Sequence, residues 1–417
     1  MNLPRCLAAA LATLSIGVAS QAAAPGARYR VTQIATPQGY AAGCVEGFAR
    51  RTTATGLNDL GIVSANFRCF TSVDATTNTY INYFHPFVAA THFGAFELPE
   101  PAGAYTSDIV AINDRLQGFG SFSNDEGLFG LRWTIGGGAE RVFTSPSAAE
   151  CLFNNNLNYA SSGNGRGYIV GWAFRADATL PPPLDTFCLT LGWVIRTPGG
   201  RQILGPANGS AYDINALDVA VGVVGNGAIK LHVPSGRQQI LDAGDATRAV
   251  ISTDINDLGE VAGYSNEFEP EDVNRTCGPS TGLRWERDGR ERPLRNLPGA
   301  TSARAWAAGY DGEAVGESGP GNYCDPDNGL QDQRAVIWKG VQATGLNALI
   351  AASERITLIV AADVNRRGQI VVTGYRNDEP QFACPDYRIN PDTGFYEIDP
   401  ANQCRNTYVY LLTPVGR

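Results

Sequence analysis

The residues best suited to catalysis are few and scattered in this sequence. It contains three histidines, His85, His92 and His232, and no Gly-x-Ser-x-Gly nucleophile elbow. A histidine acts as a base or metal ligand only beside a positioned partner. Because His85 and His232 fall on or near separate expected strands and His92 begins a turn, we expect no catalytic triad and no metal site built on histidine.

Carboxylates offer two further kinds of chemistry. The Asp-x-Asn pattern at Asp213, Asp254 and Asp363 could belong to a calcium-binding loop, but such a loop needs about six oxygen ligands. The loop after Asp254 lacks the distal bidentate Glu, and the stretch from Asp325 to Gly329 has its glycine one place too early for an EF-hand. We therefore expect turn capping at these positions, and neither a metal nor another cofactor.

Glycoside hydrolysis would need two carboxylates held close together, and the sequence cannot pair them. Convergent carboxylates in a channel would favour an enzyme, whereas an aromatic-lined groove without them would favour binding.

The elements that must position these residues follow from a repeated motif: Asn, two residues, Gly, three residues, then Gly or Ala. It is clearest at Asn256 and Asn164, and degraded copies start at Asn58, Asn113, Asn215, Gly309 and Asn365. Seven copies at roughly fifty-residue spacing are typical of a repeat architecture. The motif itself predicts a hairpin turn between two strands.

The repeat around Asn256 predicts four antiparallel strands. Its expected strands are residues 250–255, 260–264, 282–285 and 292–297. Four such strands are the unit of a β-propeller blade. The third strand carries a tryptophan in several repeats, and we expect these residues in the core: Trp133, Trp193, Trp285 and Trp338.

The two ends of the chain complement each other. The seventh repeat lacks a fourth strand, and the N-terminal region has a surplus one at Tyr29–Ile34. The sequence therefore predicts an all-β, seven-bladed propeller of four-stranded antiparallel blades, closed by the N-terminal strand.

These motifs resemble the bacterial extracellular repeat called the HAF family. The resemblance rests on the stretch from Asp254 to Gly263, on third strands of the type Arg334–Trp338, and on His85-Pro-Phe87, where that family has His-Ala-Phe. It implies a propeller-like repeat protein outside the cell and carries no catalytic residues. The sequence lacks the C-terminal sorting tail of some members.

The N-terminus predicts export. A charged Arg5, a short apolar run from Cys6 to Ala19, and Ser20-Gln-Ala22 form a signal peptide over residues 1–22, with cleavage after Ala22. Residues 23–417 are then one domain, secreted or periplasmic and expected as a monomer. A net charge of −9 argues against nucleic-acid partners, and no later stretch is long enough for membrane insertion.

Removing Cys6 from the nine cysteines leaves an even number, which favours disulfides in an exported chain. Equivalent places in the repeats suggest Cys44–Cys69 and Cys151–Cys188. Cys384 and Cys404 share one long loop and are expected to pair, which leaves Cys277–Cys324.

The long loops between second and third strands are the strongest functional hint. They emerge on one face, opposite the Asn turns, and enlarged loops on a rigid scaffold commonly carry binding residues. We expect a non-catalytic binding protein whose ligand, a carbohydrate or a protein, contacts aromatic residues on that face. An enzyme, a hydrolase or lyase, acting on an extracellular polymer and a structural envelope component remain as alternatives. The candidate ligand-binding residues are Tyr323, Phe382, Tyr387, Phe395 and Tyr396.

Overall fold

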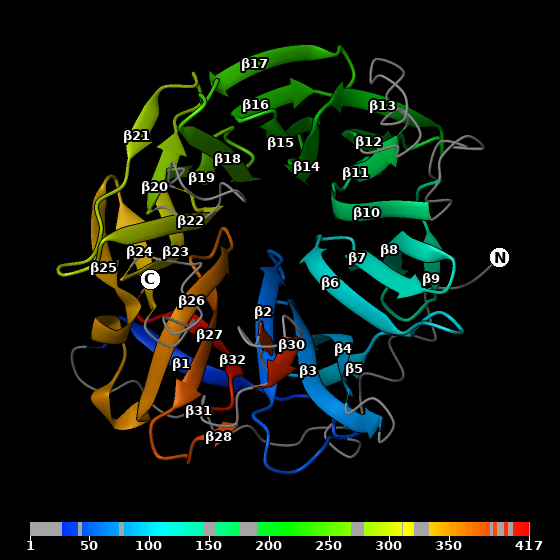
Figure 1. Ribbon diagram of the computed structural model, residues 1–417. Coiled ribbons are helices and arrows are strands. Elements are labelled where there is room, and N and C mark those ends of the chain that lie inside the picture. Colours follow the sequence, from blue (N-terminus) through cyan, green and yellow to red (C-terminus); the bar gives the residue numbers. More distant parts are fainter. Residues whose placement is uncertain are drawn as a thin grey trace.

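The computed structural model of the chain describes residues 27–40, 44–74, 79–144, 156–175, 190–267, 279–310, 312–320, 333–383, 387–389, 396–398 and 403–416. These residues form an all-β structure of four-stranded antiparallel sheets. The sheets lie around a central space, each with its innermost strand facing that space (Figure 1). Two short 3-10 helices, η4 (Leu346–Leu349) and η5 (Ala352–Glu354), join two neighbouring sheets.

Five of the sheets are separate. In four of them the strands follow chain order from the innermost strand outward, and in the fifth the N-terminal strand β1 is the outermost. They are β2 (Arg51–Leu57), β3 (Val63–Asp74), β4 (Thr79–Ala90) and β5 (Gly94–Glu97); β14 (Gly209–Ile214), β15 (Val219–Val224), β16 (Gly227–His232) and β17 (Arg237–Asp242); β18 (Arg248–Ile255), β19 (Val261–Glu267), β20 (Ser280–Trp285) and β21 (Glu291–Pro293); β22 (Ser302–Ala308), β23 (Glu313–Gly319), β24 (Arg334–Lys339) and β25 (Gln342–Gly345); and β26 (Ile356–Val364), β27 (Ile370–Arg376), β32 (Tyr408–Pro414) and β1 (Tyr29–Ile34).

Two further antiparallel groups of four are joined by a short parallel pairing of β8 with β10, so that they count as one larger sheet. They are β6 (Thr106–Ile112), β7 (Gln117–Asn124), β8 (Gly127–Thr134) and β9 (Ala139–Arg141), and β10 (Asn156–Gly163), β11 (Ile169–Arg175), β12 (Thr190–Arg196) and β13 (Gln202–Ala207). Two small two-stranded sheets pair β28 (Phe382–Ala383) with β31 (Gln403–Cys404) and β29 (Tyr387–Ile389) with β30 (Tyr396–Ile398).

The Asn motif closes the hairpin between the first two strands of each group, as the sequence predicts. At Asn256, the side-chain Oδ1 accepts hydrogen bonds from the backbone N–H groups of Leu258 and Glu260, both at 3.0 Å. Gly259 follows with a φ of +82°, where glycine is favoured because it has no Cβ. Two of the degraded copies, at Asn113 and Asn215, keep this geometry without glycine, since Leu116 and Asp218 adopt φ values of 59° and 61°.

The last position of the motif allows two strands of a sheet to lie unusually close together. A Cβ built on Gly263 would lie 2.0 Å from the carbonyl oxygen of Ile251 in the neighbouring strand and 2.9 Å from the ring of Trp285. Both contacts are too short for real atoms, so this position requires glycine.

Each innermost strand carries a β-bulge three residues before its Asn turn. The register of its pairing with the second strand shifts by one residue there, which leaves one residue without a direct partner. These residues are Thr55, Val110, Ser161, Tyr212, Thr253, Trp306 and Ala362.

The core lies between neighbouring sheets. Trp133, Trp193, Trp285 and Trp338, from the third strand of four groups, are fully buried, as the sequence predicts. Burying an indole removes a large apolar surface from water, so these four residues contribute strongly to the packing of one sheet on the next.

The two ends of the chain meet in one sheet. β1 pairs antiparallel with β32, from Tyr29 opposite Pro414 to Ile34 opposite Val409. β1 is therefore the outermost strand of the sheet that begins with β26, as the sequence predicts, and it gives β32 a partner on its outer side.

The structure corrects some local expectations. The fourth strand around Asn256 is Glu291–Pro293, shorter than the expected 292–297, because the chain leaves the sheet at Pro293 and continues as a loop. Cys69 lies inside β3 and is joined to Cys44 by the predicted disulfide. Cys404 is buried in β31. Its expected partner Cys384, like Cys151, Cys188, Cys277 and Cys324, lies outside the described residues.

The signal-peptide residues also lie outside the described ranges. Within those ranges, no helix has the length and apolar character needed to cross a bilayer.

Candidate functional site: the central pocket

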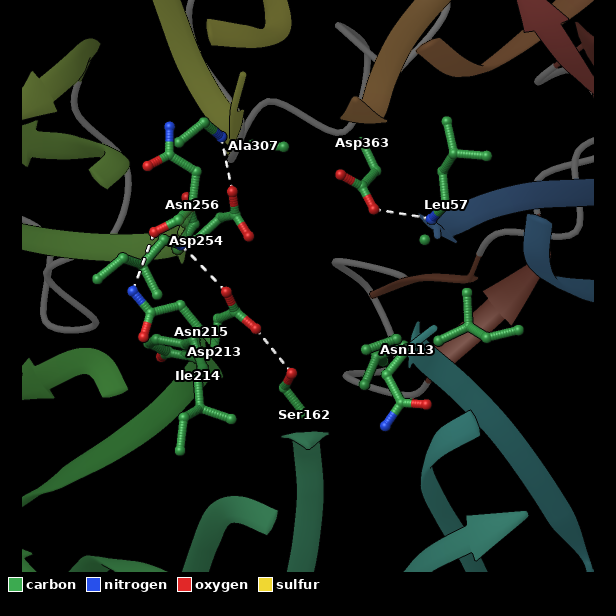
Figure 2. Close-up of a pocket in the computed structure, with 18 of the residues that line it drawn as sticks. Leu57, Asn113, Ser162, Asp213, Ile214, Asn215, Asp254, Asn256, Ala307 and Asp363 are labelled. Atoms are coloured by element: carbon green, nitrogen blue, oxygen red, sulfur yellow. Dashed lines mark hydrogen bonds between the residues drawn. The ribbon is translucent and has the colours of Figure 1, made fainter. Parts of the chain in front are cut away.

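A cavity of about 890 Å³, here called the central pocket, occupies the space between the innermost strands. It is lined mainly by residues of β2, β6, β10, β14, β18, β22 and β26 and of the turns that follow them, with one residue each from the second strands β11 and β19 (Figure 2). One end lies at the Asn turns, here called the turn end. The other lies where the chain passes from second to third strands, here called the loop end. The expected catalytic and binding groups can be located relative to these two ends.

The turn end is joined by a chain of hydrogen bonds between neighbouring sheets. The side-chain Nδ2 of one motif Asn donates to a backbone carbonyl of the next turn or strand end. The bonds run from Asn365 to Asn58 (3.0 Å), Asn58 to Asn113 (3.1 Å), Asn113 to Gly163 (3.0 Å), Asn164 to Asn215 (2.9 Å), Asn215 to Asn256 (3.0 Å) and Asn256 to Gly309 (2.7 Å). Each Asn therefore holds its own turn with Oδ1 and the neighbouring sheet with Nδ2. Gly309 has no side chain with which to continue the series.

The aspartates of the Asp-x-Asn pattern make a second set of bonds between sheets. Oδ2 of Asp213, Asp254 and Asp363 accepts the backbone N–H of Ile255 (3.1 Å), Ala308 (2.6 Å) and Leu57 (2.7 Å), respectively. In each case the donor belongs to the next innermost strand. The expectation of local turn capping was therefore incomplete, because these carboxylates connect one sheet to another.

The three carboxyl groups also face the same cavity. Figure 2 shows Asp213 and Asp254 on one side and Asp363 across the opening. Burial, together with the charges of the nearby Asp213 and Asp363, raises the pKa of Asp254 well above its usual range. Burial, only partly offset by the N–H donors of Leu57 and Val364, raises the pKa of Asp363 to about 7. The sequence could not have paired these acids, since they come from different repeats.

Arg366 lies over the turn end. Its guanidinium contacts Asp59 at 3.1 Å, reaches Asp257, and donates to the Tyr310 hydroxyl at 3.0 Å. These partners belong to three different turns, so one arginine spans several sheets at this end. About half of its side chain is exposed, which limits what the ion pairs contribute to stability.

Five of the six aromatic side chains that line the pocket in the described residues gather on one part of its wall, and the sixth, Tyr310, lies at the turn end beside Arg366. Two of them, Tyr212 and Trp306, are the bulged residues of β14 and β22. Tyr264 lies beside Trp306, with ring centroids 5.4 Å apart in an edge-to-face arrangement. Tyr159 and Trp172 stack at 5.6 Å with nearly parallel rings. All five side chains are half-buried and line the cavity.

The opposite part of the wall is built from smaller side chains. At the bulged positions of β2, β6 and β26 the residues are Thr55, Val110 and Ala362. The pocket is therefore asymmetric, although the backbone repeats around it.

A buried carboxyl fixes one of the aromatic residues. Asp108 accepts hydrogen bonds from the Tyr159 hydroxyl and from Ser121 Oγ, the latter at 2.5 Å. Burial raises the pKa of Asp108 despite these donors. Because its hydroxyl is held in this way, Tyr159 keeps one ring orientation against Trp172, which prepares a flat surface before any ligand arrives.

The candidate ligand-binding residues chosen from the sequence do not line this pocket. Phe382 packs in β28 against Ala49 and Cys404. Tyr387 and Tyr396 lie in the small β29–β30 hairpin, and Tyr323 and Phe395 lie outside the described residues. The missed signal was the position three residues before the start of each motif, where the residue type changes from repeat to repeat and is aromatic at Tyr212 and Trp306.

The histidines lie away from the pocket, as expected. His85, in β4, contacts Glu100 at 2.9 Å and stacks on Tyr40, and His232, at the end of β16, bonds Ser235 at 2.7 Å. His92 is exposed in the turn after β4. Within the described part of the chain, no three His, Cys, Asp or Glu side chains are grouped closely enough to hold a metal ion.

No protein-family model and no curated protein matches this sequence. Among solved structures, streptogramin B lyase has 9% identity and a TM-score of 0.45, covering 93% of this chain and 98% of that one. A catalytically inactive virginiamycin B lyase from Staphylococcus aureus, solved with quinupristin, has 11% identity and a TM-score of 0.41, covering 93% and 100%. An acylaminoacyl peptidase from Pyrococcus horikoshii has 9% identity and a TM-score of 0.42 over 80% of this chain, which spans only 51% of that protein. These similarities are too distant to carry an argument about function.

Proposed function

We propose that this protein is an exported, monomeric, non-catalytic binding protein, and that it takes a carbohydrate into the central pocket from the loop end. The observation that carries the proposal is the gathering of five half-buried aromatic side chains on one wall of a single cavity. Sugar rings present flat apolar C–H faces, and aromatic side chains are the usual surfaces on which such faces pack.

The proposal includes a closed seven-bladed propeller as the scaffold. Two observations support it. β2 packs against both β6 and β26, so the first innermost strand has a neighbour on each side. The pairing of β1 with β32 joins the two ends of the chain in one sheet. A closed ring would hold the walls of the pocket at fixed distances, which lowers the entropic cost of binding.

The location of the aromatic residues supports entry from the loop end. Tyr159 lies near the start of β10, and Trp172 and Tyr264 lie in second strands, beyond the bulges as seen from the Asn turns. The turn end is crossed by Arg366 and its partners. The long loops expected to bind ligand from the sequence would then surround the mouth of the pocket and extend the contact surface.

The non-catalytic part of the proposal rests on how the carboxylate oxygens are used. Asp213 accepts from Ser162 Oγ at 2.7 Å and from Ile255 N, and Asp363 accepts from two backbone N–H groups. Groups committed in this way hold sheets together and have little freedom to attack or protonate a substrate. Export is supported by the Cys44–Cys69 disulfide, a bond typical of oxidising compartments.

The test is a glycan-array screen with the purified protein, followed by calorimetric titration of the best oligosaccharide. Trp306→Ala removes an aromatic face from the pocket and should weaken binding by about tenfold or more. Phe96→Ala is the matched control, because Phe96 is an exposed aromatic residue on the outermost strand β5. If no glycan binds, or if both variants bind like the wild type, the proposal is wrong. Capture of a protein by the same surface would replace the carbohydrate with the other expected class of ligand.

A second candidate function is hydrolysis of an extracellular polymer. The convergence of Asp213, Asp254 and Asp363 on one cavity favours it, since convergent carboxylates in the channel are what the sequence leads us to expect of an enzyme. A carboxyl with a raised pKa beside other carboxyls can act as an acid. If this candidate holds, Asp254→Asn should abolish turnover of the bound polymer while leaving its affinity almost unchanged. Release of shortened products by the wild type would overturn the non-catalytic proposal.

A further inference from the structure

The charge of the central pocket indicates which kind of carbohydrate it would bind. Among the described residues, six acidic side chains line it, those of Asp59, Asp114, Asp213, Asp254, Asp257 and Asp363, and a single cationic one, that of Arg366. Arg366 is already engaged by Asp59 and Asp257. In the described residues, the other four acidic groups face the cavity without a basic side chain to pair with. Because the pKa of Asp254 is well above its usual range and that of Asp363 is about 7, these two groups hold a proton much of the time at neutral pH. The carboxylates of Asp114 and Asp213 therefore carry the negative charge that has no basic partner.

This excess acts on neighbouring groups in the pocket. Burial raises the pKa of the Tyr310 hydroxyl, and four carboxylates, those of Asp59, Asp254, Asp114 and Asp363, raise it further because they disfavour another negative charge nearby. The same field would repel an anionic ligand and attract a cationic one, and it acts more strongly in an enclosed cavity than in open water.

The aromatic wall is suited to a cation as well as to a sugar. The faces of tyrosine and tryptophan attract a positive charge within ~6 Å of the ring centroid. The chain already uses one of these rings in this way, since the guanidinium of Arg304 lies over Tyr264 at 4.9 Å. The aromatic wall and the carboxylates thus lie on the same cavity and favour the same charge.

We propose that the carbohydrate taken by the central pocket is an amino sugar with a free ammonium group, so that its ring packs on the aromatic wall while its charge faces the unpaired carboxylates. This inference rests on the proposed function for its carbohydrate part. The charge part stands separately, on the lining residues. An N-acetylated sugar keeps the same ring but loses the positive charge, and a uronic acid would bring an unfavourable negative one.

The experiment uses two matched pairs of probes with the purified full chain. The first pair is the glucosamine trimer and its fully N-acetylated form, which differ in charge on the same sugar backbone. The second pair is choline and 3,3-dimethylbutan-1-ol, which have the same shape with and without the positive charge. By calorimetric titration at neutral pH, we expect each cation to bind at least about tenfold tighter than its neutral partner, and Trp306→Ala to weaken both cations.

The outcomes separate the two proposals. Equal binding of the two trimers would overturn the cation inference and leave the carbohydrate function standing. Binding of choline without either trimer would support the cation inference and overturn the carbohydrate function. No binding in any arm would overturn both. A preference of Trp306→Ala for the charged trimer as strong as that of the wild type would assign the selectivity to the carboxylates alone and contradict the role of the aromatic wall.

Discussion

The two ends of the central pocket are built from the same repeats, but the same side chain recurs at one end, whereas the side chains vary at the other. At the turn end, Asn side chains bond from one sheet to the next with distances between 2.7 and 3.1 Å, and only the step from Gly309 lacks such a side chain. Nearer the loop end, the residues that line the wall change from small to aromatic around the ring. The comparison indicates that positions occupied by the same residue type, Asn, hold the sheets together. Positions whose residue type varies on the same backbone give the pocket its shape.

The largest expected effect comes from breaking the scaffold on which both ends depend. Deleting residues 23–35 removes β1 and leaves β32 without its outer partner. It also removes Tyr29 and Val31, which pack against the core of that sheet. The melting temperature should fall by about 10 °C or more, as measured by scanning calorimetry.

A shorter deletion of residues 23–27 provides the control, because it leaves β1 intact. A melting temperature equal to that of the full chain in the longer deletion would mean that β1 does not close the structure.

The second prediction breaks the turn end at one Asn. Asn256→Ala loses the Oδ1 acceptor of its own turn and the Nδ2 bond to Gly309, and should cost about 2–3 kcal/mol of unfolding free energy. Asn256→Asp keeps the acceptor for the turn but loses the donor to the neighbouring sheet. Chemical denaturation of both variants separates the two roles. If Asn256→Asp is as stable as the wild type, the bond between sheets contributes little.

The third prediction concerns the pH dependence of the carboxylates between sheets. The pKa of Asp363 is about 7 in the folded protein and near 4 in the unfolded chain. The folded state therefore holds the proton more tightly, so the contribution of this group to stability is lost as pH rises from about 4 to about 7, by at most ~1.4 kcal/mol per pH unit. Asp363→Asn cannot titrate and should show a flatter dependence over the same range.

Urea denaturation of both proteins at several pH values between 4 and 8 measures this difference. Parallel curves for the two proteins would show that the pKa of Asp363 is not raised.

The smallest expected effect on stability is that of removing the Arg366 side chain, which lies over the turn end. Its ion pairs are half exposed, so Arg366→Ala should cost no more than about 1 kcal/mol. The same change removes the basic side chain that the described residues contribute to the pocket lining, and should therefore tighten binding of the glucosamine trimer severalfold. Weaker binding in this variant would show that Arg366 itself contacts the ligand.

Much of the fold could be predicted because its signals are local. The turn at Asn256 follows from one side chain that accepts two backbone N–H groups and one glycine with positive φ, and both residue types are visible in the sequence. The pairing of Cys44 with Cys69 followed from equivalent places in a repeat. The short fourth strand at Glu291–Pro293 was missed because strand ends depend on what the neighbouring sheet offers, which no local pattern encodes.

The candidate site was predicted poorly for a related reason. From the sequence we chose aromatic residues in the long loops, because loops commonly bind ligands, and did not single out Trp306. Its place on the pocket wall depends on a bulge between Ala305 and Ala307, and a bulge turns a side chain away from the face that strict alternation would give it.

The sequence by itself determined the hairpins, the repeat and the tryptophan core, because turn chemistry and alternating burial act over a few residues. Only the tertiary structure decided that Asp213, Asp254 and Asp363 would face one cavity with Tyr212 and Trp306. These residues are separated by up to 151 positions in the chain, from Tyr212 to Asp363. What brings them together is the arrangement of the sheets around a common space, and no single repeat contains that information.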